Sequence, residues 1–395
     1  MKYKKSFLAI MLLILILGQG GSALAVGETN PDVKLEDLER HYEDEMNSKE
    51  VVVKAQIIEI PYDDTGEERP DIPKESDIRY QHLKVKITTG THMGEVYTVR
   101  NTIEFINPYN LIFKKGERVL LYMLEDEAGK VNSLRIFERP REEPIYYITG
   151  LFFLGIIVIG GMKGIKSVIT LIFTVVAILF VMLPLLLRGW NPILVAVGIS
   201  AITAAFTLIV VSGRNRKTYT AILGTVIGVA AAGIVALLFG HWARLTGMGT
   251  EEAQMLAYIP QNRHIDYKGL LFAGIIIGAL GAVMDVAMSI AASMAEIEFI
   301  NPKITNKDLF KSGMNVGRDI MGSMTNTLIL AYVGSSIQIL LLFLSFNVSP
   351  YAIINMDDMA SEIVRAMAGS IGLVLAIPIT AVVYIYTRKK EKNKK

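Results

Sequence analysis

The feature that most constrains this chain is a series of long apolar runs that follow Pro144. Several runs exceed the ~18 residues that distinguish a membrane-spanning helix from a buried core segment. The whole chain is 52% hydrophobic and 20% charged, which is unusual for a soluble protein. Because backbone polar groups in a bilayer must bond within their own segment, we expect an all-α membrane domain over residues 144–388. Its spans, about seven, are predicted near 146–162, 166–187, 192–212, 219–240, 269–295, 321–346 and 364–387.

The connections between these runs alternate in charge. Basic residues gather in 163–166, in 214–217, in 303–311 and in the terminal run RKKEKNKK, whereas the intervening connections carry Glu251, Glu252 and an Asp-Asp pair. The positive-inside rule therefore places the C-terminus, with the basic tail 389–395, in the cytoplasm. We interpret the terminal run as the anchor of the last helix and not as a nucleic-acid-binding patch.

Residues 1–25 combine a basic start, an apolar run from Phe7 to Leu17 and the sequence Ala23-Leu24-Ala25. This pattern predicts a secretory signal peptide with an A-x-A cleavage site. An uncleaved first membrane helix is the alternative. Both interpretations place residues 26–143 outside the cytoplasm.

Residues 26–143 are polar and change character. Alternating stretches such as DIRYQHLKVKITTG and GEVYTVRNTIEF predict short strands separated by Gly, Asp and Asn turns. We expect a small extracytoplasmic β-rich domain, and more specifically an OB-like barrel of five strands. Such a domain is either a spacer or a binding site for a protein or envelope partner.

Several classes of function lack the residues that they need. The chain has no cysteine, so disulfides and thiolate metal sites are excluded, and its five histidines show no pair at metal-ligand spacing. No Gly-rich phosphate loop or nucleophile elbow is present. We therefore expect neither an enzyme nor a cofactor, a metal or a nucleic-acid partner. The lipid bilayer is the partner that the composition predicts.

One ionisable residue, Asp285, interrupts the apolar run from Leu270 to Ala295. A charged side chain inside a membrane costs from about 3 to more than 10 kcal/mol, so it normally faces protein or water. Such a carboxyl can load and release a proton, which is the chemistry of a proton relay. The alternative is a structural group that is hydrogen-bonded to Asn326 or Thr325 across a helix pair.

Helical spacing places Asp285 on a face of small and polar residues. In steps of four, three, four and four this face contains Gly274, Gly278, Gly281, Asp285 and Ser289, and Glu296 follows eleven residues, about three turns, after Asp285. Small residues let a neighbouring helix approach closely. We therefore predict that this face packs against protein and not against lipid.

The next helix has a matching face. It contains Asn315, Asp319, Gly322 and Asn326, with Arg318 beside it and hydroxyls at Ser323, Thr325 and Thr327. The last span repeats the pattern with Arg365, Gly369, Gly372 and Ala376. We predict one packed core of three helices, with packing glycines at Gly274, Gly278, Gly281, Gly322, Gly369 and Gly372. Arg318 and Asp319 also fit a simpler role, as a snorkelling cation and an acid near a helix start.

The runs LFAGIIIGALGAVMDVAMSIAASMAEI and SGMNVGRDIMGSMTNTLILAYVGSSIQILLLF resemble the YibE/F family of bacterial multi-pass membrane proteins, over roughly residues 146–387. The resemblance implies a protein of the bacterial cell membrane. The last three helices are also similar, more weakly, to SecD/SecF and the RND transporters, through Asp285, Glu296, Arg318, Ile320, Ser323 and Thr325. In that superfamily an intramembrane Asp belongs to the proton-coupling path, which implies Asp285 as a proton carrier.

These observations predict a proton- or ion-coupled transporter. Its coupling residues are expected to be Asp285, Glu296, Arg318, Asp319, Asn326, Ser323 and Thr325. The alternative is a scaffold or assembly factor that transports nothing and whose β domain binds an envelope partner. The sequence names no substrate and leaves homo-oligomer formation open.

Overall fold

The computed structural model describes residues 49–66, 69, 77–104, 107, 109–126, 129–258 and 265–392. The predicted signal peptide, 1–25, lies outside these residues. Chain contacts divide the protein into two compact units, one that ends at Gly150 and one that begins at Leu151. The predicted fold class, a β-rich N-terminal domain followed by apolar helices, is confirmed.

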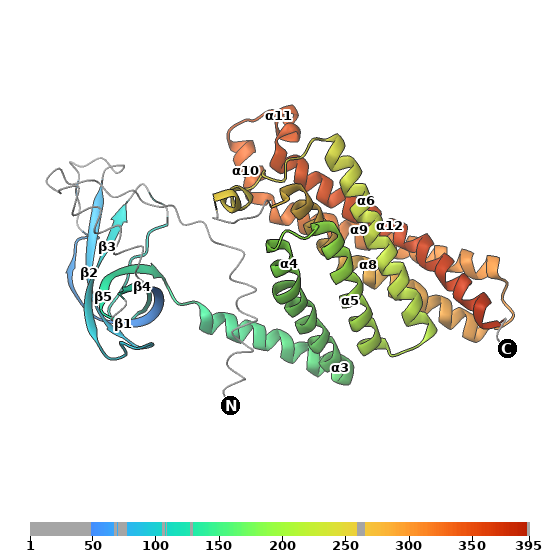
Figure 1. Cartoon of the computed structure of the whole chain (residues 1–395), viewed down its shortest axis with the longest axis horizontal. Coiled ribbons are helices and arrows are strands. Elements are labelled where there is room, and N and C mark those ends of the chain that lie inside the picture. The colour runs from blue at the N-terminus through green and yellow to red at the C-terminus, as the bar shows by residue number, and fades with distance from the viewer. Residues whose placement is uncertain are drawn as a thin grey trace. The chain divides into compact units, whose positions relative to one another are not determined.

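The N-terminal unit is a five-stranded antiparallel sheet that closes on itself (Figure 1). Its strands are β1 (Lys49–Asp63), β2 (Ile78–Ile87), β3 (Val96–Glu104), β4 (Arg118–Glu125) and β5 (Val131–Glu138). The strand order is β3-β2-β1-β4-β5, and β3 also contacts β5. The long β1 carries register shifts at residues 57–59 and 59–62, which bend the strand so that it pairs with both β2 and β4. This is the order of a small OB-like barrel.

Alternation along the strands builds the interior of the barrel. Apolar side chains at every second position point inward, among them Val53, Ala55, Ile57, Leu83, Val85, Ile87, Val99, Leu121 and Met123. Two inward positions of β2 are polar, Arg79 and Gln81. Gln81 donates to the carbonyl of Phe113 at 3.0 Å and accepts from its N–H at 3.0 Å. Asn101 of β3 donates to Gln81 Oε1 at 3.2 Å and to the Leu111 carbonyl at 2.6 Å. These bonds fasten the segment before β4 to the barrel, because its buried backbone groups need partners.

Lowering the pH is expected to loosen the barrel through Asp64. Burial of this carboxyl raises its pKa, but a hydrogen bond from the Tyr80 N–H at 2.6 Å and an ion pair with Arg69 at 2.5 Å outweigh burial and hold the pKa below 3.8. A depressed pKa means that the ionised carboxylate stabilises the barrel above the unfolded-state pKa, and that this stability is lost as the pH falls through the folded value. Hydrogen exchange of strand β2 in the full chain, corrected for intrinsic rates, should therefore accelerate below about pH 4. Asp64→Asn should weaken this dependence, whereas Glu59→Gln on the exposed face should not; equal pH profiles for all three proteins would contradict the assignment.

The second unit is helical. Its elements are α3 (Glu142–Ala177), a π-helical turn (Ile178–Met182), α4 (Leu183–Leu187), α5 (Pro192–Ser212), α6 (Arg216–Trp242), α7 (Glu251–Met255), a 3₁₀ turn (Leu256–Tyr258), α8 (Tyr267–Ile300), α9 (Asn306–Ser335), α10 (Ile337–Ser345), α11 (Pro350–Asn355) and α12 (Asp357–Lys392). By length and composition, five helical stretches of the described chain can cross a membrane, or six if the bent pair α9–α10 counts as one span.

Side-chain caps set where the long helices begin. The side chain of Asn191 accepts from the N–H groups of residues 193 and 194, and Pro192 occupies the first turn of α5. Asn215, Asp266 and Thr305 cap α6, α8 and α9 in the same way. Each cap satisfies backbone donors that the first turn of a helix leaves free.

Three predicted spans differ in their bounds from the helices. The predicted spans 146–162 and 166–187 fall on one continuous 46-residue stretch, which is broken at Gly161 by φ 54° and ψ −132°. A Cβ on Gly164 would lie 2.1 Å from the carbonyl oxygen of Ile156, so the chain turns sharply at this break. The predicted span 321–346 contains the 57° bend between α9 and α10, at the Gly334-Ser335-Ser336 sequence. Gly and Ser pairs are common sites of helix kinks.

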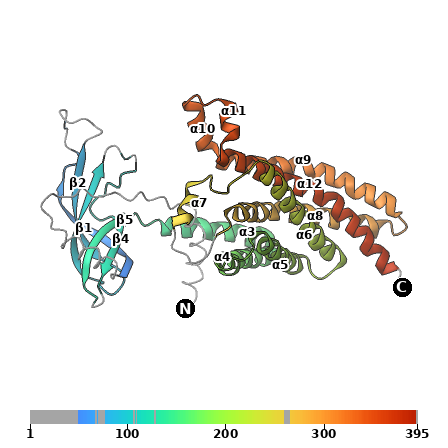
Figure 2. The same ribbon diagram turned by 45° about the horizontal axis from the view of Figure 1, so that its top comes forward.

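Small residues hold α6, α8 and α12 close together, and Figure 2 shows these helices side by side with α9. Two glycines of α6 lie against α12: a Cβ on Gly224 would meet Thr380 at 2.1 Å, and one on Gly228 would meet Ala376 at 2.8 Å. Gly372 of α12 faces Ala232 of α6. Van der Waals contact between backbones therefore organises this core.

Gly372→Ala is expected to destabilise the helical unit by about 1–3 kcal/mol, because overpacking forces the neighbours to move. The new Cβ would lie 2.4 Å from the Ala232 Cβ and 3.1 Å from the Gly228 carbonyl oxygen. The matched control is Gly198→Ala on α5, where nothing lies within 4 Å; it should be neutral or gain up to about 1 kcal/mol from helix propensity. Thermal unfolding followed by circular dichroism compares the two, and equal Tm values would refute the close packing.

Candidate functional site

The face of α8 that carries Asp285 is open within the single chain. Gly274, Gly278, Gly281, Asp285 and Ser289 are all exposed, as their spacing on one face requires, and Glu296 is exposed too. The opposite side of α8 forms the core and buries Ala273, Ile276, Leu280, Val283, Ala287 and Ile290. We predicted that the glycine face packs against protein, but a Cβ on Gly274 or Gly281 would meet nothing within 4 Å. The helix packs through its apolar side because that side buries more surface.

Helices α8 and α9 form an antiparallel hairpin, and their contacts give its register. A Cβ on Gly313 would touch the Met294 side chain at 2.6 Å, one on Gly317 would lie 3.4 Å from Ile290, and one on Gly278 would lie 3.0 Å from the Tyr332 hydroxyl. Interpolation between these contacts places Asp285 at the level of Gly322. Gly322 also has nothing within 4 Å of its Cβ position. The carboxylate therefore lies halfway along the hairpin, beside a stretch of open space.

The polar residues predicted on α9 are likewise open. Asn315, Arg318, Asp319, Ser323 and Asn326 are exposed. Arg318 donates to Asn315 Oδ1 at 3.1 Å within the same helix, and Ser323 donates to the carbonyl of Ile320 at 3.0 Å. In the described part of the chain, no hydrogen bond or ion pair joins Asp285 to Asn326 or Thr325.

Helices α9 and α12 both carry buried polar atoms that have no hydrogen-bond partner. The Tyr332 hydroxyl is buried without a hydrogen-bond partner, between the Cβ positions of Gly278 on α8 at 3.0 Å and Gly369 on α12 at 3.7 Å. The Oγ1 of Thr325, the Nε of Arg365 and the Oγ of Ser370 are also buried and unpartnered. Buried polar groups are normally satisfied by protein, water or a ligand. These atoms therefore offer unused hydrogen-bonding positions to water or to a ligand.

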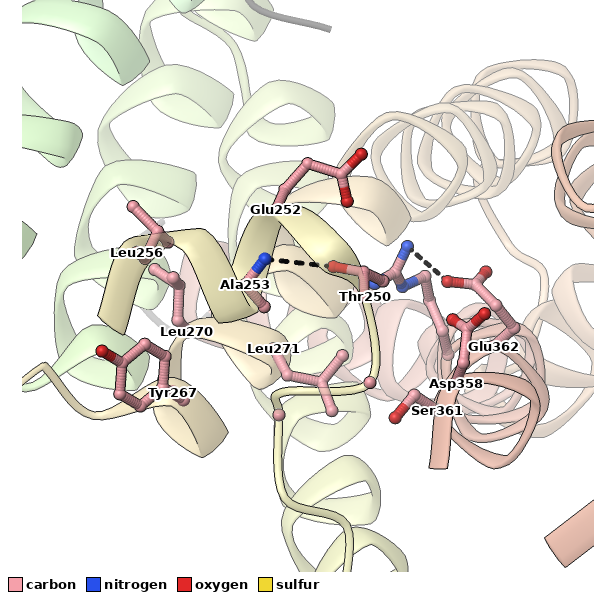
Figure 3. A pocket seen from close by; sticks show the side chains of 13 residues that line it. Thr250, Glu252, Ala253, Leu256, Tyr267, Leu270, Leu271, Asp358, Ser361 and Glu362 are labelled. Atoms are coloured by element: carbon pink, nitrogen blue, oxygen red, sulfur yellow. Dashed lines mark hydrogen bonds and ion pairs between the residues drawn. The ribbon is translucent and has the colours of Figure 1, made fainter. Parts of the chain in front are cut away.

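A pocket of about 240 Å³ opens at the end of the bundle where α8 and α12 begin (Figure 3). Asp358, Ser361 and Glu362 of α12 line one side, and Leu256, Leu270 and Leu271 line the other. Arg365 pairs with Glu362 at 2.9 Å. Among the described residues, no group of three or more His, Asp or Glu side chains is placed to hold a metal ion.

Two family comparisons match the two units of the chain. The family described as "YibE/F-like protein" matches residues 148–390, and the "YibE/F family N-terminal domain" matches residues 51–136. The chain belongs to the YibE/F family. The searches of curated proteins and of solved structures each found no match. The weaker likeness of the last three helices to SecD/SecF stays a prediction.

The region matched by the YibE/F family also contains a cluster of ion pairs that the sequence analysis did not predict. This cluster lies at the opposite end of the helical bundle from the pocket. Glu298 of α8 pairs with Arg216 of α6, accepts from the Tyr384 hydroxyl at 2.9 Å and pairs with Arg388 of α12 at 2.8 Å. Arg388 is 1% exposed and also donates to Asn306 Oδ1 at 2.8 Å. Its five N–H donors fit such a multiple role.

The sequence held a signal for this cluster. Arg216 begins α6, whereas Glu298 and Arg388 lie near the ends of α8 and α12. Because α6 runs opposite to α8 and α12, these three charged residues lie at the same end of the helical bundle. The predicted residue, Glu296, lies two positions before Glu298 and therefore points to the other side of the helix. The first arginine of the terminal basic run thus belongs to a buried ion cluster.

Proposed function

We propose that this YibE/F protein is a proton- or ion-coupled transporter of the bacterial cell membrane, with Asp285 as the coupling carboxylate. The observation that supports it most is the setting of this side chain. It lies midway along a membrane-length hairpin, on an open face, and has no ion-pair partner among the described residues.

The energetics favour a group that changes its protonation state. An ionised carboxylate on a lipid-facing surface costs far more free energy than a protonated carboxyl, which carries no charge. The face must therefore be covered by water or by a second copy of the chain whenever Asp285 is ionised. A carboxyl that is stable in two protonation states in two surroundings is what coupling to a proton or cation requires.

Hydroxyl groups without a partner on α9 and α12 support a route for protons. Thr325, Tyr332 and Ser370 offer hydroxyls that are not engaged with the described protein, and a hydroxyl both donates and accepts. Open space at Gly281 and Gly322 borders the carboxylate. Water that bridges these groups would connect Asp285 to the end of the bundle that bears Arg365. The charge pattern of the loops predicts that this end lies outside the cytoplasm.

The test is flux through proteoliposomes of the full chain. A pH-sensitive dye inside the vesicles reports proton movement, with Na⁺, K⁺ or ammonium as the partner ion. Wild type should exceed empty vesicles, and Asp285→Asn should not. A folded Asp285→Asn protein that keeps wild-type flux would refute the proposal.

The β domain supports a second candidate, a scaffold that binds an envelope partner. Its outer face carries two aromatic contacts: Tyr62 packs edge-on against the His82 ring at 5.5 Å, and Arg100 lies 4.7 Å from the ring centre of Tyr80. Such groups are frequent in binding surfaces. Under this alternative, deletion of residues 51–136 would abolish cellular function while Asp285→Asn would be mild.

A further inference from the structure

We infer that the pocket at the start of α12 binds a small organic ammonium ion with a short apolar group. No family description assigns a ligand to it. The pocket is lined from three segments: the loop and short helix α7, the first turns of α8 and the first turns of α12. Its volume of about 240 Å³ lies below the ~300–1,000 Å³ of drug-sized ligands, so it suits a small molecule.

The charge of the lining favours a cation. Glu252, Asp358 and Glu362 contribute carboxylates, and the Arg365 guanidinium is held by Glu362 at 2.9 Å. Glu252 and Asp358 form no salt bridge among the described residues, and Arg365, the cation nearest to Asp358, is already paired with Glu362. Arg365 attracts the Asp358 carboxylate, and Glu252 lies close enough to repel it. A bound cation between these two groups would remove that repulsion.

Ser361 supplies the independent evidence for a ligand. Its side chain is 6% exposed, lines the pocket and leaves Oγ without a hydrogen-bond partner. Figure 3 shows Ser361 between Asp358 and Leu271, on the side of α12 that faces the pocket. A buried hydroxyl without a partner is costly, so a donor inside the pocket would stabilise it. A primary ammonium group has three donors and can reach a hydroxyl and a carboxylate together.

The side of the pocket opposite the carboxylates favours a ligand with an apolar group. Leu256, Leu270 and Leu271 lie across from the acidic side, as Figure 3 shows for Leu256 and Leu270. An alkylammonium ion of three to five carbons therefore matches the lining: its ammonium faces Asp358 and Ser361, and its chain contacts the leucines. Assigning this ion as the transported substrate rests on the proposed function, whereas its binding does not.

Binding is tested with butylammonium on the full chain in nanodiscs, by saturation-transfer NMR titration. 1-Butanol has the same chain without the charge, and norvaline adds a carboxylate to the same amine. We expect butylammonium to bind at least tenfold more tightly than either. Equal binding of 1-butanol would show simple partitioning and overturn the inference, and preferred binding of norvaline would overturn it in favour of an amino-acid site.

Variants locate the site. Asp358→Asn should weaken butylammonium binding at least tenfold and Ser361→Ala severalfold, whereas Glu251→Gln, next to Glu252 but outside the lining, should bind like wild type. Ser361→Ala removes one buried oxygen and is the variant most certain to fold, which circular dichroism checks. Unchanged binding in Ser361→Ala and Asp358→Asn would refute the site.

Asp285→Asn separates this inference from the proposed function. It should bind butylammonium normally but show no flux. If wild type shows flux but does not bind butylammonium, the ammonium site is refuted and the transporter proposal stands. If wild type binds butylammonium but shows no flux, the transporter proposal is refuted and the ammonium site stands.

Discussion

Proteoliposomes that contain Asp285→Asn are expected to pass no more protons than empty vesicles. The amide keeps the size and shape of the carboxyl but has no titratable oxygen, so it cannot carry a proton. Because Asp285 is exposed and unpaired among the described residues, the substitution should change the free energy of unfolding by no more than about 0.5 kcal/mol. Loss of flux in a folded protein would then report the chemistry of the carboxyl and not a loss of structure.

Two further variants sharpen this result. Asp285→Glu keeps an ionisable carboxyl on a side chain one methylene longer, and it should retain part of the flux. Ser289→Ala, one turn further along the same open face, should retain most of it. If Ser289→Ala abolished flux as completely as Asp285→Asn, the effect would belong to the whole face, and the specific role of Asp285 would be refuted.

The largest loss of stability is expected from Glu298→Gln. This substitution removes the negative charge between the Arg216 and Arg388 guanidiniums and leaves two cations facing one another. Removing one partner of a buried ion pair typically costs about 3–5 kcal/mol. Glu298 is partly exposed, so we expect the lower end of that range, about 3 kcal/mol. Thermal unfolding of the full chain in detergent, followed by circular dichroism, measures the change.

The matched control is Glu296→Gln, two residues earlier on the same helix and exposed. It should change stability by less than about 0.5 kcal/mol. A second substitution, Arg388→Gln, in the Glu298→Gln background should recover part of the loss, because it removes the unpaired buried cation. Equal effects of Glu298→Gln and Glu296→Gln would contradict the cluster.

Four predicted spans coincide closely with helices. The runs 192–212, 219–240, 269–295 and 364–387 fall on α5, α6, α8 and α12. The length of each apolar run was enough to predict a helix, because a segment that spans a bilayer must satisfy its own backbone hydrogen bonds. The break at Gly161 lies beside the connection that the sequence predicts between the first two spans, next to Lys163, whereas the bend at Ser336 falls inside the predicted span 321–346. A helix break depends on a few local dihedrals that hydropathy does not report.

The sequence by itself determined the class of this protein and the relative directions of side chains within each helix. Helical periodicity is a property of the backbone, so Asp285, Ser289 and Glu296 share a face whatever surrounds them. Only the tertiary structure decided which face meets a neighbour. It buried the apolar side of α8, left the glycine face open and joined Glu298 to Arg388, ninety residues further along the chain. Rotation of one helix against another is set by packing over many residues distant in sequence, and no local pattern records it.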